Sequence, residues 1–228
     1  MIKNIIFDLD DTLFDFSKAE RVAVKRTLME LGVNVCENHL NRYSEINLAQ
    51  WKLLEQGKLT RDEVKVRRYE LLFKEFNINK DASQTTAIYE NYLSQGHYYL
   101  NNAHSVLKDL SKNYSLFIAS NGSSAVQHGR ISSSDLEDYV KGIFVSQEVG
   151  YNKPDKRFFD YLFNKTGINK NETIMVGDSL SSDIQGGVNC GIKTVWFNRK
   201  KEENNTFVMP NYEINDLSEL HGLIAGIK

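Results

Sequence analysis

The 228-residue sequence is poor in proline and cysteine, with only Pro154, Pro210, Cys36 and Cys190. So few prolines leave no proline-rich linker to mark a domain boundary. Two cysteines far apart in the chain exclude the dense disulfide framework of a small secreted domain, although a single bridge between them stays open. No basic and then apolar leader precedes Ile5, so we expect a reduced, cytoplasmic protein.

An excess of one charge and long apolar runs are also missing. Lys and Arg number 28 against 30 Asp and Glu, which gives a net charge of -2. Such a balance gives no electrostatic footprint for a nucleic-acid polymer or an anionic membrane surface. No run approaches the roughly 20 apolar residues that a membrane span requires. We therefore expect a small ligand, no nucleic-acid or membrane partner, and either a monomer or a homodimer.

The feature that stands out is the apolar run Ile5–Phe7, which ends abruptly in Asp8, Asp10 and Asp11. A short β-rich run without alternation is typical of a central strand in a parallel sheet, where both faces are covered. The acids would then lie at the carboxyl end of the strand, where open α/β sheets bind ligands. Side chains two apart share one face of a strand, so Asp8 and Asp10 are expected to stay close.

These clustered carboxylates repel one another, and keeping them ionised together needs a cation such as Mg2+ or a nearby lysine. The alternative is that the stretch from Asp8 to Asp11 is a solvated turn, because Asp is a common turn former. A site that binds a cation requires further acids or a lysine elsewhere in the chain.

No strand is evident between the first run and about residue 100. Helices are expected over residues 17–32, 37–56, 60–76 and 81–100, with capping-box spacing in the pairs Ser17 with Glu20 and Thr60 with Glu63. A βαβ chain would return to a strand after its first helix. Residues 16–100 are therefore predicted to be an inserted helical domain, and residues 1–15 and 101–228 an α/β core.

The aromatic residues of the helical block are predicted to pack in its interior. They include Tyr43, Trp51, Tyr69, Phe73, Tyr89 and Tyr92. Phe14 and Phe16 differ because they lie at the junction beside Asp10. For these two, stacking on the ring of a ligand stays open beside core packing.

Two later segments repeat the opening layout of apolar residues followed by polar ones. The strand Ser115–Ala119 leads to Ser120, Asn121 and Gly122, where a hydroxyl and a tight backbone turn suit an anion, although an ordinary turn has the same composition. Lys153 precedes a proline that holds it on extended backbone before a helix. A lone lysine is otherwise solvent-facing, so its function depends on its neighbours.

A third strand, Thr173–Val176, leads to Asp178, and Asp183 follows five residues later. Each acid could simply cap a helix N-terminus, since Asp favours that position. Both could instead supply oxygen ligands of the kind that Mg2+ prefers.

The segments FDLDDT, SNG, KPD and GDSLSSD resemble, in this order, the four motifs of the haloacid dehalogenase-like hydrolase superfamily. The resemblance extends from Ile5 to about Phe197. It implies a doubly wound, Rossmann-like parallel sheet with an inserted four-helix cap that closes to exclude water. It also implies Mg2+ as cofactor and a small phosphorylated metabolite as substrate.

By this resemblance Asp8 is the nucleophile that attacks phosphorus, and Asp10 protonates the leaving oxygen and then activates water. Lys153 would neutralise the nucleophile and the phosphoryl oxygens, while Ser120 and Asn121 would bind the transferring group. The presence of Asp10 argues against carbon–halogen hydrolysis, because dehalogenase members of the superfamily generally lack this second acid.

The resemblance also implies a metal site made of Asp8, Asp178 and the region of Asp10, where a backbone carbonyl would contribute. Asp183 would bind the ion directly or through a water. The five histidines show no ligand spacing, and no role follows for them.

The longer segments DLDDTLFDF, SNGSSAVQHGR, GYNKPD and GDSLSSDIQGG are most similar to the bacterial pyrimidine 5'-nucleotidase branch of the superfamily. This likeness implies uridine, deoxyuridine or thymidine monophosphates as substrates. The alternatives on the same core are a sugar-phosphate or phosphoglycolate phosphatase and a phosphoglucomutase-type phosphotransferase. Outside enzymes, the alternative is a catalytically silent regulatory or binding protein.

Overall fold

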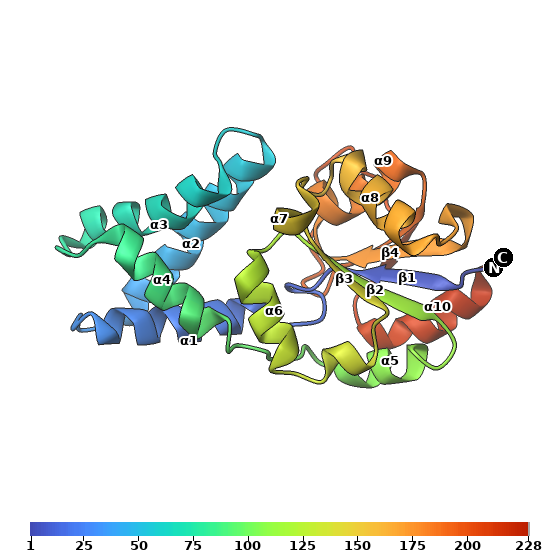
Figure 1. Cartoon of the computed structure of the whole chain (residues 1–228), viewed down its shortest axis with the longest axis horizontal. Coiled ribbons are helices and arrows are strands. Elements are labelled where there is room, and N and C mark those ends of the chain that lie inside the picture. The colour runs from blue at the N-terminus through green and yellow to red at the C-terminus, as the bar shows by residue number, and fades with distance from the viewer. Residues whose placement is uncertain (228) are drawn as a thin grey trace. The chain divides into compact units, whose positions relative to one another are not determined.

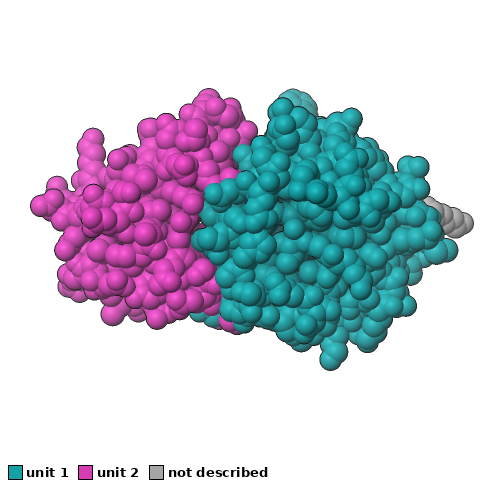
Figure 2. All heavy atoms as spheres, in the orientation of Figure 1, with its two compact units in different colours: residues 1–15, 98–228 teal, residues 16–97 magenta. Residues whose placement is uncertain are grey.

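The computed structural model describes residues 1–227 and divides into two compact units. The first unit contains residues 1–15 and 98–228, and the second contains residues 16–97 (Figure 2). The second unit is thus an insertion in the sequence of the first. Its role as a cap stays a prediction.

The first unit is built on one parallel sheet with the strand order β3-β2-β1-β4-β5-β6. The strands are β1 Asn4–Phe7, β2 Ser115–Ser120, β3 Gly142–Val145, β4 Thr173–Gly177, β5 Lys193–Phe197 and β6 Tyr212–Ile214. The strand order reverses its direction of growth at β1, which pairs with β2 on one side and β4 on the other. This confirms the predicted doubly wound α/β fold with the acidic run in the centre.

Alternate residues of the central strands face two different cores, as the pleat requires. Ile5 and Phe7 belong to a core with side chains from α5 (Ala103–Leu110) and α10 (Leu220–Gly226). Ile6 belongs to a second core, with side chains from α8 (Lys156–Thr166) and α9 (Gln185–Cys190). Figure 1 shows these helix pairs on opposite faces of the sheet. Both faces are covered, which explains why Ile5, Ile6 and Phe7 of β1 are all apolar.

The remaining elements of the first unit are short. They are α6 Ser124–Ser132, α7 Ser146–Val149, the 3-10 turns Leu136–Asp138, Lys170–Glu172 and Leu217–Glu219, and the π-helical turn η3 Leu180–Ile184. Strand β6 was not predicted, because three residues give too little pattern to separate a strand from a loop.

The second unit consists of four helices, as predicted. They are α1 Phe16–Glu30, α2 Glu37–Glu55, α3 Arg61–Phe76 and α4 Ala82–Leu93. Helix α3 begins with the predicted capping box, in which the Thr60 hydroxyl accepts from the N–H of Glu63. Tyr43, Tyr69 and Tyr89 are fully buried between the helices, as expected for packing residues.

Two predictions for this unit are wrong in detail. The capping box of Ser17 and Glu20 does not form, because α1 already begins at Phe16. Glu20 is instead buried, and its carboxylate accepts hydrogen bonds from the side chains of Ser44 and Asn47. Helix α4 ends at Leu93 rather than near residue 100. Within the part of the chain that the structure describes, no helix is long and apolar enough to span a membrane.

Candidate active site

Polar residues follow three adjacent strands at one edge of the sheet. Asp8 comes directly after β1, Ser120 ends β2, and Asp178 comes directly after β4. The backbone N–H of Asp8 still donates to Val176 in β4, with N–O at 2.9 Å, so the sheet pairing extends to the first acid. Because the strands are parallel, their carboxyl ends share one edge, and the three side chains start from the same place.

The carboxylates of Asp8, Asp178 and Asp183 converge there. One oxygen from each lies within 4.8 Å of the others. Asp183 reaches the cluster from the π-helical turn η3, and its Oδ2 accepts from the N–H of Ser179 at 3.1 Å. A Cβ atom on Gly177 would overlap the Asp183 side chain, so the glycine that ends β4 allows this approach.

Lys153 supplies the cation that the acidic cluster needs. Its Nζ lies 2.6 Å from Oδ1 of Asp8 and 2.7 Å from Oδ1 of Asp183, and it also donates to the carbonyl of Ala119. The side chain of Lys153 is 1% exposed. The amide of Asn121 fixes the lysine backbone, because its Oδ1 accepts from the Lys153 N–H and its Nδ2 donates to the Lys153 carbonyl, both at 2.8 Å.

The electrostatics of this cluster follow from burial. Removal from water raises the pKa of Asp8 to about 8, and Lys153 offsets only part of that effect. Burial, together with repulsion from Asp183 and Asp8, also raises the pKa of Asp178 well above its ordinary value. Burial alone would lower the pKa of Lys153, but the attraction of Asp183 and Asp8 outweighs it and raises that pKa. Lys153 therefore stays charged, whereas ionisation of Asp8 and Asp178 is disfavoured in the absence of a further cation.

A divalent cation fits this donor set. When all three carboxylates are ionised, the one ammonium of Lys153 leaves two negative charges without compensation. Mg2+ prefers carboxylate oxygen ligands and keeps several waters, so a few converging acids suffice. Asp178 is held in place for such a role, because its N–H donates to the Thr12 hydroxyl at 3.1 Å and its carbonyl accepts from Trp196 at 2.8 Å.

The carboxylate of Asp10 belongs to a second group of contacts. Its Oδ2 accepts from Nε2 of Gln127 at 2.6 Å, and its Oδ1 forms an ion pair with the guanidinium of Arg130. The same Gln127 nitrogen donates to the Ser120 hydroxyl at 2.7 Å. Asp10 is not among the acids that converge on the possible cation site. A metal contact through its backbone carbonyl stays a prediction.

Gln127 and Arg130 were not identified from the sequence. Both lie on α6, three residues apart and therefore on one helix face. That helix follows β2 directly, so its first turns face the same edge of the sheet. This position was the available signal, because polar residues on the inner face of such a helix have few partners other than the site.

Phe14 is wrong as a candidate for stacking on a ligand. Its ring is fully buried and packs edge-on against Tyr99, with ring centroids 4.9 Å apart. The guanidinium of Arg130 lies 5.3 Å from the centre of the same ring. Phe14 therefore supports the site from inside the core.

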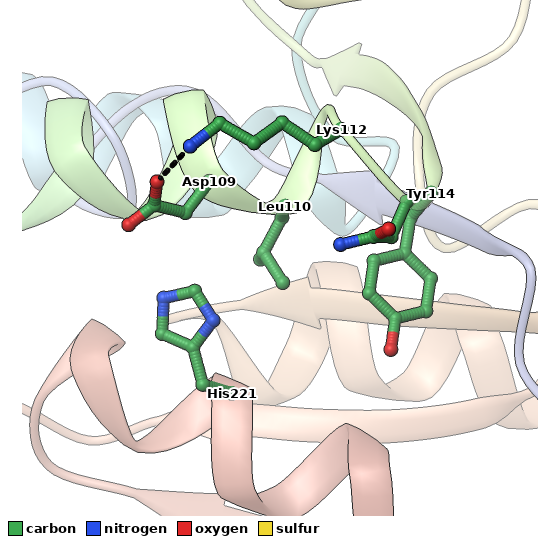
Figure 3. A pocket seen from close by; sticks show the side chains of 6 residues that line it. Asp109, Leu110, Lys112, Tyr114 and His221 are labelled. Carbon is green, nitrogen blue, oxygen red and sulfur yellow. Dashed lines mark hydrogen bonds and ion pairs between the residues drawn. The ribbon is translucent and has the colours of Figure 1, made fainter.

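A separate pocket lies at the other end of the sheet. It is lined by Asp109, Leu110, Lys112, Asn113, Tyr114 and His221 (Figure 3). Most of these residues belong to the end of α5 and the turn that leads into β2, so they precede the strand whose far end carries Ser120. Lys112 is already paired with Asp109 at 2.7 Å. This pocket is distinct from the acidic cluster.

The fold and the cluster together define an α/β protein whose acids and buried lysine converge at the carboxyl ends of parallel strands. A sequence model of the haloacid dehalogenase-like hydrolase family matches residues 5–197, and the chain belongs to that family. The match includes the inserted helices as well as the acidic cluster and Lys153.

Several curated relatives extend over almost the whole chain. The pyrimidine 5'-nucleotidase PynA of Streptococcus pneumoniae is 39% identical, with 96% of this chain and 93% of that protein covered. The pyrimidine 5'-nucleotidase YjjG of Escherichia coli is 29% identical, and the alignment covers 97% of this chain and 97% of that protein. A glyceraldehyde 3-phosphate phosphatase of Pyrococcus furiosus is 30% identical over 86% of this chain and 80% of its own length.

The fold is also similar to solved structures. A crystal structure of the HAD-hydrolase YfnB of Bacillus subtilis bound to magnesium matches with a TM-score of 0.94 at 34% identity, and 99% of each chain is covered. The presence of magnesium in that relative agrees with the donor set found here.

Proposed function

We propose that this protein is a Mg2+-dependent phosphatase that hydrolyses small phosphomonoesters through an aspartyl phosphate on Asp8. The preferred substrates are nucleoside 5'-monophosphates that carry a pyrimidine base. The observation that carries the chemistry is the contact of buried Lys153 with both Asp8 and Asp183 at the end of the central strand.

In the first step an oxygen of Asp8 bonds to phosphorus while the bond between phosphorus and the leaving oxygen breaks. Asp10 gives its proton to that leaving oxygen. In the second step a water oxygen bonds to phosphorus, Asp10 takes the proton from the water, and the bond to Asp8 breaks. Two carboxyl groups with different contacts suit these separate tasks.

Lys153 and Ser120 would stabilise the phosphoryl group during both steps. The ammonium of Lys153 neutralises charge beside the nucleophile, and the Ser120 hydroxyl binds a phosphoryl oxygen. Asp8, Asp178 and Asp183 would hold Mg2+, with Asp183 contributing directly or through a water. When bound, the ion supplies Lewis-acid stabilisation of the phosphoryl charge.

The names of the relatives support the choice of substrate. Two curated proteins that match nearly the whole chain are pyrimidine 5'-nucleotidases, at 39% and 29% identity. A second candidate is a sugar-phosphate phosphatase. The glyceraldehyde 3-phosphate phosphatase at 30% identity favours it, although it covers less of the chain.

The test is phosphate release from a panel of nucleoside monophosphates, glyceraldehyde 3-phosphate, phosphoglycolate and hexose phosphates, with Mg2+ and with a chelator. Pyrimidine monophosphates should lead in Mg2+, and the variant Asp8→Asn should be inactive. Asp109→Asn, which changes an exposed acid far from the cluster, is the matched control and should keep wild-type turnover. If sugar phosphates lead, the substrate assignment fails while the chemistry stands. If Asp8→Asn keeps its activity, the nucleophile assignment is wrong.

A further inference from the structure

Gln127 and Arg130 join two groups that the proposed chemistry treats separately. Nε2 of Gln127 donates to Oδ2 of Asp10 at 2.6 Å and to Oγ of Ser120 at 2.7 Å. Arg130 pairs with the other oxygen of Asp10, and its Nη1 also donates to Oε1 of Gln127 at 3.1 Å. The amide nitrogen of Gln127 thus links the carboxyl proposed for proton transfer, Asp10, to the hydroxyl proposed for phosphate binding, Ser120.

We infer that Gln127 and Arg130 are positioning residues, which hold the carboxyl of Asp10 and the hydroxyl of Ser120 in the relative geometry that phosphoryl transfer needs. This inference rests on the proposed function. It adds two residues, both on α6, to the catalytic machinery of the site.

The three side chains of this arrangement differ in their exposure to solvent. Arg130 is fully buried and Gln127 is 1% exposed, whereas the side chain of Asp10 is 28% exposed. The two α6 residues therefore hold the acid from the interior, and part of the carboxyl stays open. A buried guanidinium needs a paired acid, because an uncompensated charge in the interior is costly. The pair thus restricts the rotation of Asp10.

The same contacts orient the hydroxyl of Ser120. Its Oγ accepts from Gln127 and from the backbone N–H of Gly122 at 3.2 Å. A serine hydroxyl has two acceptor positions and one donor hydrogen. With both acceptor positions used, the group offers its hydrogen to a further partner. A phosphoryl oxygen is such a partner.

Gly122 makes room for this arrangement. A Cβ at that position would lie 2.5 Å from Nε2 of Gln127 and 2.7 Å from its Cδ. Any larger residue at this position would displace the amide that bridges Asp10 and Ser120. Gly122 therefore leaves space for the Gln127 side chain, in addition to its predicted role in the backbone turn.

The experiment compares Arg130→Met, Gln127→Glu and Gly122→Ala with wild type on two substrates. One is the nucleoside monophosphate that wild type hydrolyses fastest, whose alkoxide leaving group needs a proton. The other is p-nitrophenyl phosphate, whose leaving group needs little protonation. Arg67→Met and Gln84→Glu make the same chemical changes at exposed positions of the helical unit and are the matched controls.

For Arg130→Met we expect kcat on the nucleotide to fall by about 100-fold, the low end for loss of acid–base catalysis. KM should change by less than about threefold, since no substrate contact is lost. With p-nitrophenyl phosphate the same variant should release a burst of p-nitrophenol equal to the enzyme concentration, because only the second step then needs Asp10. A merely structural role would lower kcat equally on both substrates and give no burst.

Thermal unfolding checks separately that each variant folds, and calorimetry measures its Mg2+ binding. Every variant should still bind Mg2+, because Asp8, Asp178 and Asp183 are unchanged. If Arg130→Met does not fold, Gln127→Glu and Gly122→Ala carry the test with the same expected fall in kcat. Variants that fold and stay within about twofold of wild-type kcat overturn the inference. A wild type that hydrolyses no monoester contradicts the proposed function instead.

Discussion

At the scale of single residues, the site depends on how one buried lysine balances several buried acids. Lys153 contacts Asp8 and Asp183 at 2.6 and 2.7 Å with almost no exposure to solvent. Such a pair is costly to break, because the acids that remain stay buried without a partner. The lysine is therefore important for stability as well as for the proposed chemistry.

The variant Lys153→Met should be both less stable and less active than wild type. We expect the free energy of unfolding in a chelator at neutral pH to fall by about 3–5 kcal/mol, the usual cost of breaking a buried ion pair. We also expect kcat to fall by about 10²–10³-fold through lost stabilisation of phosphoryl charge. Urea unfolding and phosphate release measure the two effects. Lys112→Met, at an exposed lysine paired with Asp109, is the control, and equal losses in both variants would contradict the assignment.

At the scale of elements, the ends of the strands position the chemistry. The glycine that ends β4 allows the turn η3 to bring Asp183 to the acidic cluster. The packing of one turn against one strand end thus controls the candidate cation site. A substitution at that glycine should change metal binding although every carboxylate residue of the cluster is kept.

Gly177→Ala should weaken Mg2+ binding by about tenfold or more, the range seen when groups that orient metal ligands are changed. The reason is the overlap of the new Cβ with Asp183. Isothermal titration with Mg2+ measures the effect. Gly222→Ala is the matched control, because a Cβ at Gly222 meets nothing within 4 Å. An unchanged dissociation constant for Gly177→Ala would show that Asp183 does not need this close approach.

Patterns within single elements predicted much of this arrangement. The apolar run Ile5–Phe7 indicated a central strand, and the sheet topology confirms it. The same reasoning identified Thr60 and Glu63 as a capping box, which also forms. These features depend on neighbours in sequence, so composition and spacing are sufficient to find them.

Contacts between distant elements could not be found in this way. Gln127 and Arg130 reach Asp10 across more than a hundred residues of sequence, and the local pattern of α6 does not state which strand end its inner face meets. For Glu20 the sequence instead predicted a local contact that does not form. Its spacing from Ser17 indicated a cap, but tertiary hydrogen bonds from Ser44 and Asn47 determine its position.

At the scale of the whole molecule, all the residues assigned to the chemistry belong to the first unit, residues 1–15 and 98–228. Their burial links the stability of the protein to pH and to Mg2+. The raised pKa of Asp8, about 8, means that the folded, metal-free protein binds a proton which the unfolded chain has released above its ordinary pKa of 3.8. The contribution of Asp8 to the stability of the metal-free protein therefore falls as pH rises from about 4 to about 8.

Mg2+ should oppose this loss, since it binds the ionised acids and competes with their protons. A hundredfold excess of Mg2+ over its dissociation constant contributes about 2.7 kcal/mol to stability. We expect the rise in Tm on adding Mg2+ to be larger at about pH 8 than at about pH 5, because fewer protons must be displaced. Thermal unfolding with Mg2+ and with a chelator at both values checks this. A rise in Tm that is independent of pH would contradict the linkage.

The central claim is that Asp8 carries the phosphoryl group during turnover. The direct measurement is rapid quenching of the enzyme with a substrate whose phosphate is isotopically labelled, followed by reduction of the acyl phosphate with borohydride and peptide mass spectrometry. The account predicts a modified residue at Asp8, formed in wild type and absent in Asp8→Asn. A label on another residue, or turnover at the wild-type rate with no modification at Asp8, would contradict it.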